Sequence, residues 1–198
     1  MASGKDQPFL PGLGPERRGR RVTGLLEHKF FLAVKPDAAV VGRIGDAASC
    51  LVRENQLTGN PLKLENFHIS LPLIWKDADF PADLAEIVSA QVQAVRMSPF
   101  EIVLDMAMSF PQPGRHVLVL GIMRSIANIY DLNRKLVFAM GSKAGRPSFT
   151  PHMTVFYADR PIEKQPVKPI GWTVREFVLI HSFVGLGRHE IVGRWPLR

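Results

Sequence analysis

Cysteine is almost absent from the sequence, and this absence restricts the class of protein. Cys50 is the only cysteine among 198 residues, so no disulfide can form within the chain, which excludes a secreted scaffold built on disulfides. No apolar run approaches the roughly 20 residues that cross a bilayer, and the N-terminus lacks the continuous apolar core of a signal peptide. We therefore expect a soluble cytoplasmic protein that does not act at a membrane.

Several signatures of metal and nucleotide chemistry are also missing. The sequence has no H-E-x-x-H pair, no Cys/His set at zinc spacing and no G-x-x-x-x-G-K-[ST] loop. The pair Gly185 and Gly187 lacks the third glycine of a dinucleotide fingerprint and predicts a turn. Cys50 follows Ala47 on the apolar face of a predicted helix, so we interpret it as a core residue rather than a nucleophile. We expect no metal and no cofactor.

Acidic residues are fewer than basic ones, 18 against 25, which gives a net charge of +7 and predicts attraction to a phosphate-bearing partner. Four arginines, Arg17, Arg18, Arg20 and Arg21, lie in a Gly- and Pro-rich start without helical or strand periodicity. This extension either follows a phosphate backbone or is a solvated tail, the interpretation that we favour. We divide the chain into an extension, 1–27, and a single domain, 28–198, expected to be monomeric.

From residue 29 onward the apolar residues follow regular periods. Helical stripes predict helices over 37–53, from 81 to about 95, and over 125–140. Alternating or β-branched runs predict strands near 29–34, 67–74, 100–106, 116–122, 153–157, 173–180 and 190–195. Helices alternate with strands early and strands cluster at the end. That order favours an α+β architecture over a doubly wound parallel sheet.

Two short motifs share the pattern His, apolar, hydroxyl, apolar. They are His68-Ile69-Ser70-Leu71 and His152-Met153-Thr154-Val155. Residues two apart on a strand point to the same face, so each histidine lies beside its own hydroxyl while the apolar residues point into a core. One such motif alone is more often a structural histidine. Two copies, each after a matched strand–helix unit, favour a catalytic role over a structural one. The other histidines have no hydroxyl two residues later: His28, His116, His181 and His189.

Two imidazoles and two hydroxyls facing each other would suit a phosphodiester. Imidazole titrates near neutrality, so one ring can accept a proton from the attacking group and the other can donate one to the leaving oxygen. Ser70 and Thr154 would donate hydrogen bonds to the non-bridging phosphate oxygens. The motifs therefore predict a metal-independent phosphodiesterase with His68, Ser70, His152 and Thr154 as its catalytic residues.

At these motifs the sequence resembles the 2H phosphoesterase superfamily, in particular the bacterial 2′-5′ RNA ligase or RNA 2′,3′-cyclic phosphodiesterase family. The resemblance covers roughly residues 29–197. It rests on the paired aromatics Phe30-Phe31, the runs 65–71 and 149–155 around the two histidines, the Phe110-Pro111-x-Pro113-Gly114-Arg115 turn, and the tail from Glu176-Phe177 through Gly187-Arg188 to Arg194-Trp195-Pro196-Leu197.

The resemblance implies a bilobal α+β fold with pseudo-twofold symmetry, in which two antiparallel sheets flank a central cleft and helices lie outside. It implies hydrolysis of 2′,3′-cyclic phosphate ends of RNA without metal, and reversible 2′-5′ ligation in some members. The four motif residues match the catalytic positions of the family. Which histidine is the acid stays open.

The sequence also departs from the family pattern. Relatives often have an arginine five residues after the second histidine, where this chain has Tyr157. Lys143, Arg146 or Arg188 could supply the phosphate-binding charge instead, and Phe31 could stack a base, although a core role for Phe31 is more common. An RNA- or nucleotide-binding module with little turnover, and an enzyme for small cyclic nucleotides, remain alternatives.

Overall fold

The computed structural model describes residues 26–141 and 149–198. The basic residues Arg17 to Arg21 and the loop residues Lys143 and Arg146 lie outside the described residues, so their predicted roles stay predictions. None of the helices in the described part has the length and hydropathy of a membrane span.

Three α-helices form close to their predicted positions: α1 (Ala38–Glu54), α2 (Leu84–Val92) and α3 (Ile126–Ala139). Each buries one stripe, because residues three or four apart share a helix face. In α1 the buried residues are Val40, Ile44, Ala48 and Leu51.

Cys50 does not join that stripe, so its interpretation as a core residue is wrong. The side chain is half-exposed, and its thiol donates a hydrogen bond to Glu54 Oε1 at 3.0 Å. A residue next to Leu51 in the chain lies about 100° away around the helix, which carries Cys50 to the rim of the buried face. The bond to Glu54 raises the pKa of the thiol, and this argues against a nucleophile.

The strands are β1 (His28–Val34), β2 (Gly59–Pro61), β3 (Ile69–Asp77), β4 (Phe100–Gln112), β5 (Arg115–Gly121), β6 (His152–Ala158), β7 (Gln165–Val174), β8 (Glu176–Phe183) and β9 (Arg188–Pro196). A short 3-10 helix, η2 (Leu64–Asn66), precedes β3. The turn predicted at Gly185 and Gly187 connects β8 to β9, and both glycines have positive φ.

The predicted strand near 173–180 is two strands in the structure, since β7 ends at Val174 and β8 begins at Glu176. The greater part of β7 was missed, because Pro166, Pro169 and Gly171 within it argue against a strand. Among the strands of the described residues β7 pairs only with β4, which makes it an edge strand, and an edge tolerates proline since one side needs no ladder hydrogen bonds. The three-residue β2 was also not predicted.

Within the described residues the strands form one antiparallel sheet in the order β7-β4-β5-β6-β3-β1-β8-β9, with β2 added alongside β6. A single residue pair, Ile69 with Met153, joins β3 to β6. The sheet therefore consists of two four-stranded halves: β3-β1-β8-β9, the first-motif half, and β7-β4-β5-β6, the second-motif half.

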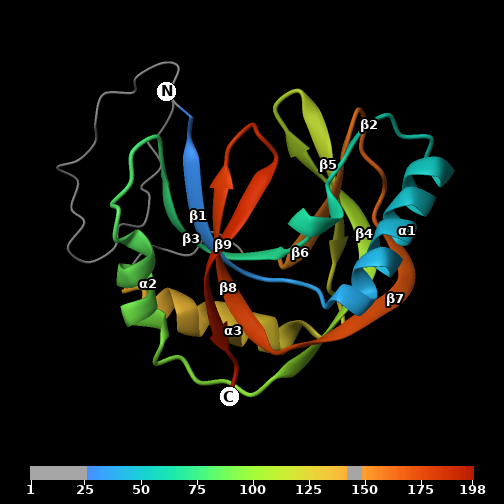
Figure 1. Cartoon of the computed structure of the whole chain (residues 1–198). Coiled ribbons are helices and arrows are strands. Elements are labelled where there is room, and N and C mark those ends of the chain that lie inside the picture. The colour runs from blue at the N-terminus through green and yellow to red at the C-terminus, as the bar shows by residue number, and fades with distance from the viewer. Residues whose placement is uncertain (1–25, 142–148) are drawn as a thin grey trace, which may run out of the picture.

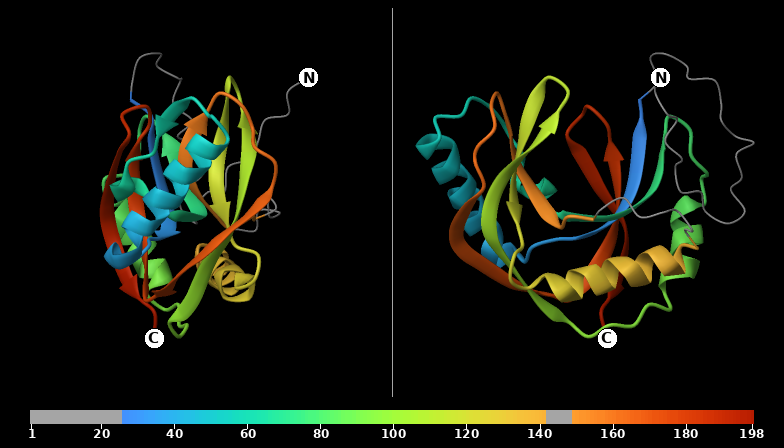
Figure 2. Two further views of the ribbon diagram at one scale, coloured as in Figure 1. Left: turned by 90° about the vertical axis from the view of Figure 1, so that its right-hand side faces the viewer. Right: turned by 180° about the vertical axis from the view of Figure 1, so that it is seen from behind.

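The two halves rise on either side of their junction, with α1 outside the second-motif half, α2 outside the first-motif half and α3 beneath both (Figures 1 and 2). One face of the sheet packs with the buried stripes of the helices in one apolar cluster, which includes Leu32, Ile69, Leu118 and Met153. We call the opposite face the inner face. The arrangement confirms the predicted α+β class.

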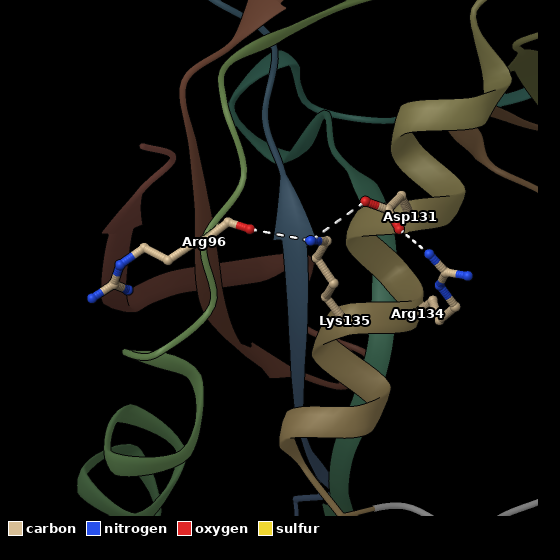
Figure 3. A network of polar contacts seen from close by, with 4 residues as sticks. All are labelled: Arg96, Asp131, Arg134 and Lys135. Atoms are coloured by element: carbon tan, nitrogen blue, oxygen red, sulfur yellow. Dashed lines mark hydrogen bonds and ion pairs between the residues drawn. The ribbon is translucent and has the colours of Figure 1, made fainter.

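Polar contacts dock α3 against the segment that connects α2 to β4 (Figure 3). Lys135 Nζ donates to the backbone carbonyl of Arg96 at 3.3 Å and lies 3.7 Å from Asp131 Oδ2, while Arg134 pairs with the same carboxylate. Such exposed pairs contribute about 0–1 kcal/mol each. They orient α3, whereas the burial of Ile129, Leu132 and Leu136 provides most of its stability.

Candidate active site

The two histidine motifs meet at the junction between the halves. Ile69 and Met153 are Cα partners across β3 and β6, and both are 0% exposed on the helix-covered face. Continuing this antiparallel register by one residue in each direction puts His68 opposite Thr154 and Ser70 opposite His152. Directly opposite residues have Cβ atoms about 4.5–5.5 Å apart. The structure thus brings all four predicted catalytic residues together on the inner face.

Both imidazoles are held in the same tautomer by the backbone. Nδ1 of His68 donates to the carbonyl of Asn66 at 2.6 Å, and Nδ1 of His152 donates to the carbonyl of Thr150 at 2.7 Å. A carbonyl can only accept, so in each neutral ring Nε2 is the proton acceptor. Nε2 of His68 lies 3.1 Å from Ser70 Oγ, so the serine hydroxyl donates to it.

Burial keeps both rings neutral near pH 7. Desolvation lowers the pKa of His68 to about 4, and positive charge at His189, Lys35 and His152 acts in the same direction. Desolvation also lowers the pKa of His152. A neutral imidazole with an unprotonated Nε2 is the form of histidine that accepts a proton.

Lys35 supports the first motif from the end of β1. Its ammonium donates to the backbone carbonyls of Glu65 at 2.6 Å and Phe67 at 3.2 Å, on both sides of Asn66, whose carbonyl holds His68. Burial and the nearby Arg194 lower the pKa of Lys35. This lysine thus fixes the turn that presents His68, a role that no local sequence pattern indicates.

An aromatic ring packs against each histidine. The ring centroid of Phe31 is 5.0 Å from that of His68, and that of Phe110 is 4.9 Å from that of His152. Phe31 is only 9% exposed, in a small inner-face cluster with Ala33, Val178 and Ile180. So little exposed ring favours the core role for Phe31, beneath the imidazole, over base stacking.

His189, on β9, is a third imidazole that the sequence reasoning missed. Its ring centroid lies 5.4 Å from that of His68 and 5.9 Å from that of Phe31. The Nδ1 atom is buried without a hydrogen-bond partner among the described residues, and desolvation lowers the pKa of the ring. His189 does not fit the His-x-Ser/Thr pattern, because no hydroxyl follows it two residues later. Its position beside His68 depends on the pairing of β8 with β9.

Arg188, predicted to contact substrate, is not brought into this group. Its guanidinium lies over the ring of Phe183 at 4.6 Å and pairs with Glu190. Arg188 is the Cα partner of Phe183, and the next pair is His189 with Ser182. Neighbouring strand residues point to opposite faces of a sheet. His189 therefore points to the inner face, and Arg188 points to the helix-covered face.

Tyr157, by contrast, points to the inner face, because a β-bulge in β6 shifts the alternation of its side chains. Val119 is paired with Thr154 but Leu118 with Phe156, so Val155 is an extra residue in β6 and the alternation shifts by one. Tyr157 thereby shares a face with His152 and Thr154. The guanidinium of Arg115 lies 4.0 Å above its ring.

The described residues contain no group of three or more His, Cys, Asp or Glu side chains placed to hold a metal ion.

A family model agrees with this geometry. The 2′-5′ RNA ligase superfamily model matches residues 36–182, which include both motifs. The chain belongs to this superfamily. No curated protein gives a significant sequence match.

Solved structures show the same fold. The apo form of Escherichia coli LigT has a TM-score of 0.68 at 22% identity, covering 87% of this chain and 98% of LigT. LigT complexed with 3′-AMP has a TM-score of 0.64 at 21% identity, covering 86% and 98%. Thermus thermophilus TT0787 has a TM-score of 0.65 at 18% identity, also covering 86% and 98%. The resemblance to the 2H phosphoesterases and the predicted α+β fold are both confirmed.

Proposed function

We propose that the protein is an RNA 2′,3′-cyclic phosphodiesterase that works by His/His acid–base catalysis. The register of β3 and β6 supports this proposal, because His68, Ser70, His152 and Thr154 then share one face. The backbone contacts of both Nδ1 atoms leave Nε2 of each ring for proton transfer. Membership of the 2′-5′ RNA ligase superfamily supports the substrate class, as does the +7 net charge.

We assign His68 as the base and His152 as the acid in hydrolysis. His68 has its pKa lowered to about 4, so its Nε2 is unprotonated and can take a proton from water as the water oxygen bonds to phosphorus. The P–O3′ bond breaks, and His152 protonates the departing O3′, leaving a 2′-phosphomonoester. His152 is neutral in the free protein, but the phosphodiester anion raises the pKa of a nearby imidazole.

Ser70 and Thr154 would bind the non-bridging oxygens, where charge builds in the transition state. Ser70 donates to His68 Nε2 in the free protein, so its hydroxyl must turn to the phosphate when substrate binds. That rotation also frees Nε2 to face the attacking water.

Activity on a short oligonucleotide with a 2′,3′-cyclic phosphate end, in excess EDTA, tests the function. We expect conversion to the 2′-phosphate at a rate unaffected by the chelator, because the imidazoles supply both proton transfers. Product analysis by phosphorus NMR or mass spectrometry identifies the phosphate position. Dependence on an added divalent ion would contradict the mechanism.

A binding module with little turnover is the alternative, and Tyr157 favours it because relatives often have an arginine there. This module would bind RNA equally well in the wild type and in the double variant His68→Ala, His152→Ala, and neither protein would hydrolyse the cyclic end. Turnover by the wild type excludes it.

The assignment of base and acid predicts an acidic pH optimum. The profile of kcat/KM reports groups of the free enzyme. Activity should fall below about pH 4 as His68 becomes protonated, and should fall again at a pH below 6.5 as His152 loses its proton, since its pKa is lowered from 6.5. The assignment requires the pKa of His152 to lie above that of His68, so it predicts a maximum of kcat/KM between about pH 4 and 6.5. The maximum of kcat lies at higher pH, because the bound phosphate anion raises the pKa of both imidazoles. A kcat/KM maximum above pH 7 would contradict the assignment.

A further inference from the structure

Arg115 and Tyr157 form a stacked pair on the inner face, away from the four motif residues. The guanidinium carbon of Arg115 is 4.0 Å from the centroid of the Tyr157 ring, within the range of a cation–π interaction. Arg115 opens β5 and is exposed, whereas Tyr157 is half-buried in β6. Gln112, the Cα partner of Arg115 in β4, accepts a hydrogen bond from its Nε at 3.2 Å.

Strand register places this pair on the same face as the second motif. Val119 is the partner of Thr154 and Val117 the partner of Tyr157, and Arg115 follows them at two-residue steps along β5. The pair therefore continues the row that starts at His152 and Thr154. Val119 and Arg115 are four residues apart on β5, about 13 Å at roughly 3.3 Å per residue, which is within reach of the next nucleotides of an extended RNA strand.

Close packing fixes the Tyr157 backbone. A Cβ on Gly59, whose φ is +145°, would lie 1.9 Å from the Tyr157 carbonyl oxygen, so only glycine lets β2 approach β6 this closely. The pairing of Asn60 with Tyr157 holds β6 from its other side. Tyr157 is thus a rigid support for the guanidinium.

Arg115 has hydrogen-bonding capacity left for a ligand. A guanidinium has five N–H donors, of which the one on Nε goes to Gln112. In residues 26–141 and 149–198 no carboxylate forms an ion pair with Arg115. Its two terminal nitrogens can therefore bind a phosphate in a bidentate manner.

We propose that Arg115, held by Tyr157 and Gln112, binds a backbone phosphate of single-stranded RNA on the 5′ side of the reacting end. The proposal rests on the proposed function. A 2′,3′-cyclic phosphate terminates the 3′ end of a strand, so every further nucleotide extends in the 5′ direction. This site makes the protein selective for oligonucleotides over cyclic mononucleotides, which have no second phosphate to bind.

Binding by the full chain tests the proposal independently of turnover. The probes are a fluorescent pentanucleotide with a 3′-phosphate and a nucleoside 3′-phosphate, followed by anisotropy and by competition. We expect Arg115→Gln to weaken pentanucleotide binding about tenfold, near the lower end of the range for hydrogen bonds to a charged group, and to reduce the slope of log K against log salt by about 0.7.

Further variants separate the stacked pair from general charge. Arg53→Gln, on the helix α1, removes the same charge from an exposed site outside the inner face and should bind the pentanucleotide like the wild type. Tyr157→Phe keeps the ring and should also bind normally, whereas Tyr157→Ala should resemble Arg115→Gln. In hydrolysis, the ratio of kcat/KM for the cyclic pentanucleotide to that for the cyclic mononucleotide should fall about tenfold in Arg115→Gln.

Three results would overturn the proposal: unchanged pentanucleotide binding by Arg115→Gln, an equal loss in Arg53→Gln, or a parallel loss for the nucleoside 3′-phosphate, which would place Arg115 at the reacting phosphate. A wild type that binds the pentanucleotide through Arg115 but hydrolyses no cyclic end would sink the proposed function and leave this site standing.

Discussion

Alanine at either His68 or His152 is expected to lower kcat for a 2′,3′-cyclic phosphate end by roughly 10²–10⁴-fold, since each variant removes one proton-transfer group. The fold should be retained, because each ring makes one hydrogen bond to the backbone, at the carbonyl of Asn66 or Thr150, whereas Ile69 and Met153 form the buried junction. Steady-state kinetics with circular dichroism as the check on folding measures both.

His116→Ala is the matched control. His116 lies on β5 opposite Ala158, and it alternates with Val117, which belongs to the inner face. Its loss should leave kcat within about a factor of two of the wild-type value, an effect below 0.5 kcal/mol. The double variant of His68 and His152 should be little worse than either single one, because residues that act as a unit are strongly non-additive. Substantial activity in His152→Ala would refute the two-imidazole mechanism.

The parts of the fold that could be predicted from the sequence are those in which local pattern and tertiary environment agree. Period-two alternation around His68 and His152 correctly indicated which residues are buried, since Ile69 and Met153 are 0% exposed. β7 could not be predicted because its prolines suit an edge strand, and edge position is a property of the whole sheet.

The rest of the candidate site depends on pairing between distant segments. His189 reaches the His68 ring only because β9 is paired with β8 and β8 with β1. Tyr157 faces inward only because of the extra residue Val155 in β6. Neither feature leaves a local pattern in the sequence. The two motifs alone predicted the four candidate catalytic residues, whereas the neighbours of these residues depend on long-range strand pairing.

Removing the hydroxyl from either Ser70 or Thr154 is expected to lower kcat about 10²–10³-fold, the range for one donor to a developing oxyanion. Both side chains lie beside the histidines through the register at Ile69 and Met153, so each can reach a non-bridging oxygen. Since charge builds on these oxygens in the transition state, the loss should appear in kcat more than in KM. Steady-state kinetics of Ser70→Ala and Thr154→Ala on one cyclic oligonucleotide measures it.

Conservative replacements at these two positions separate the loss of the hydroxyl from a loss of packing. Ser70→Thr and Thr154→Ser, which keep a hydroxyl, should recover most of the lost rate. If the conservative replacements lowered kcat as much as the alanine variants do, the two side chains would act through packing. Stabilisation of the phosphate oxygens requires only the O–H donor, which Ser70→Thr and Thr154→Ser retain.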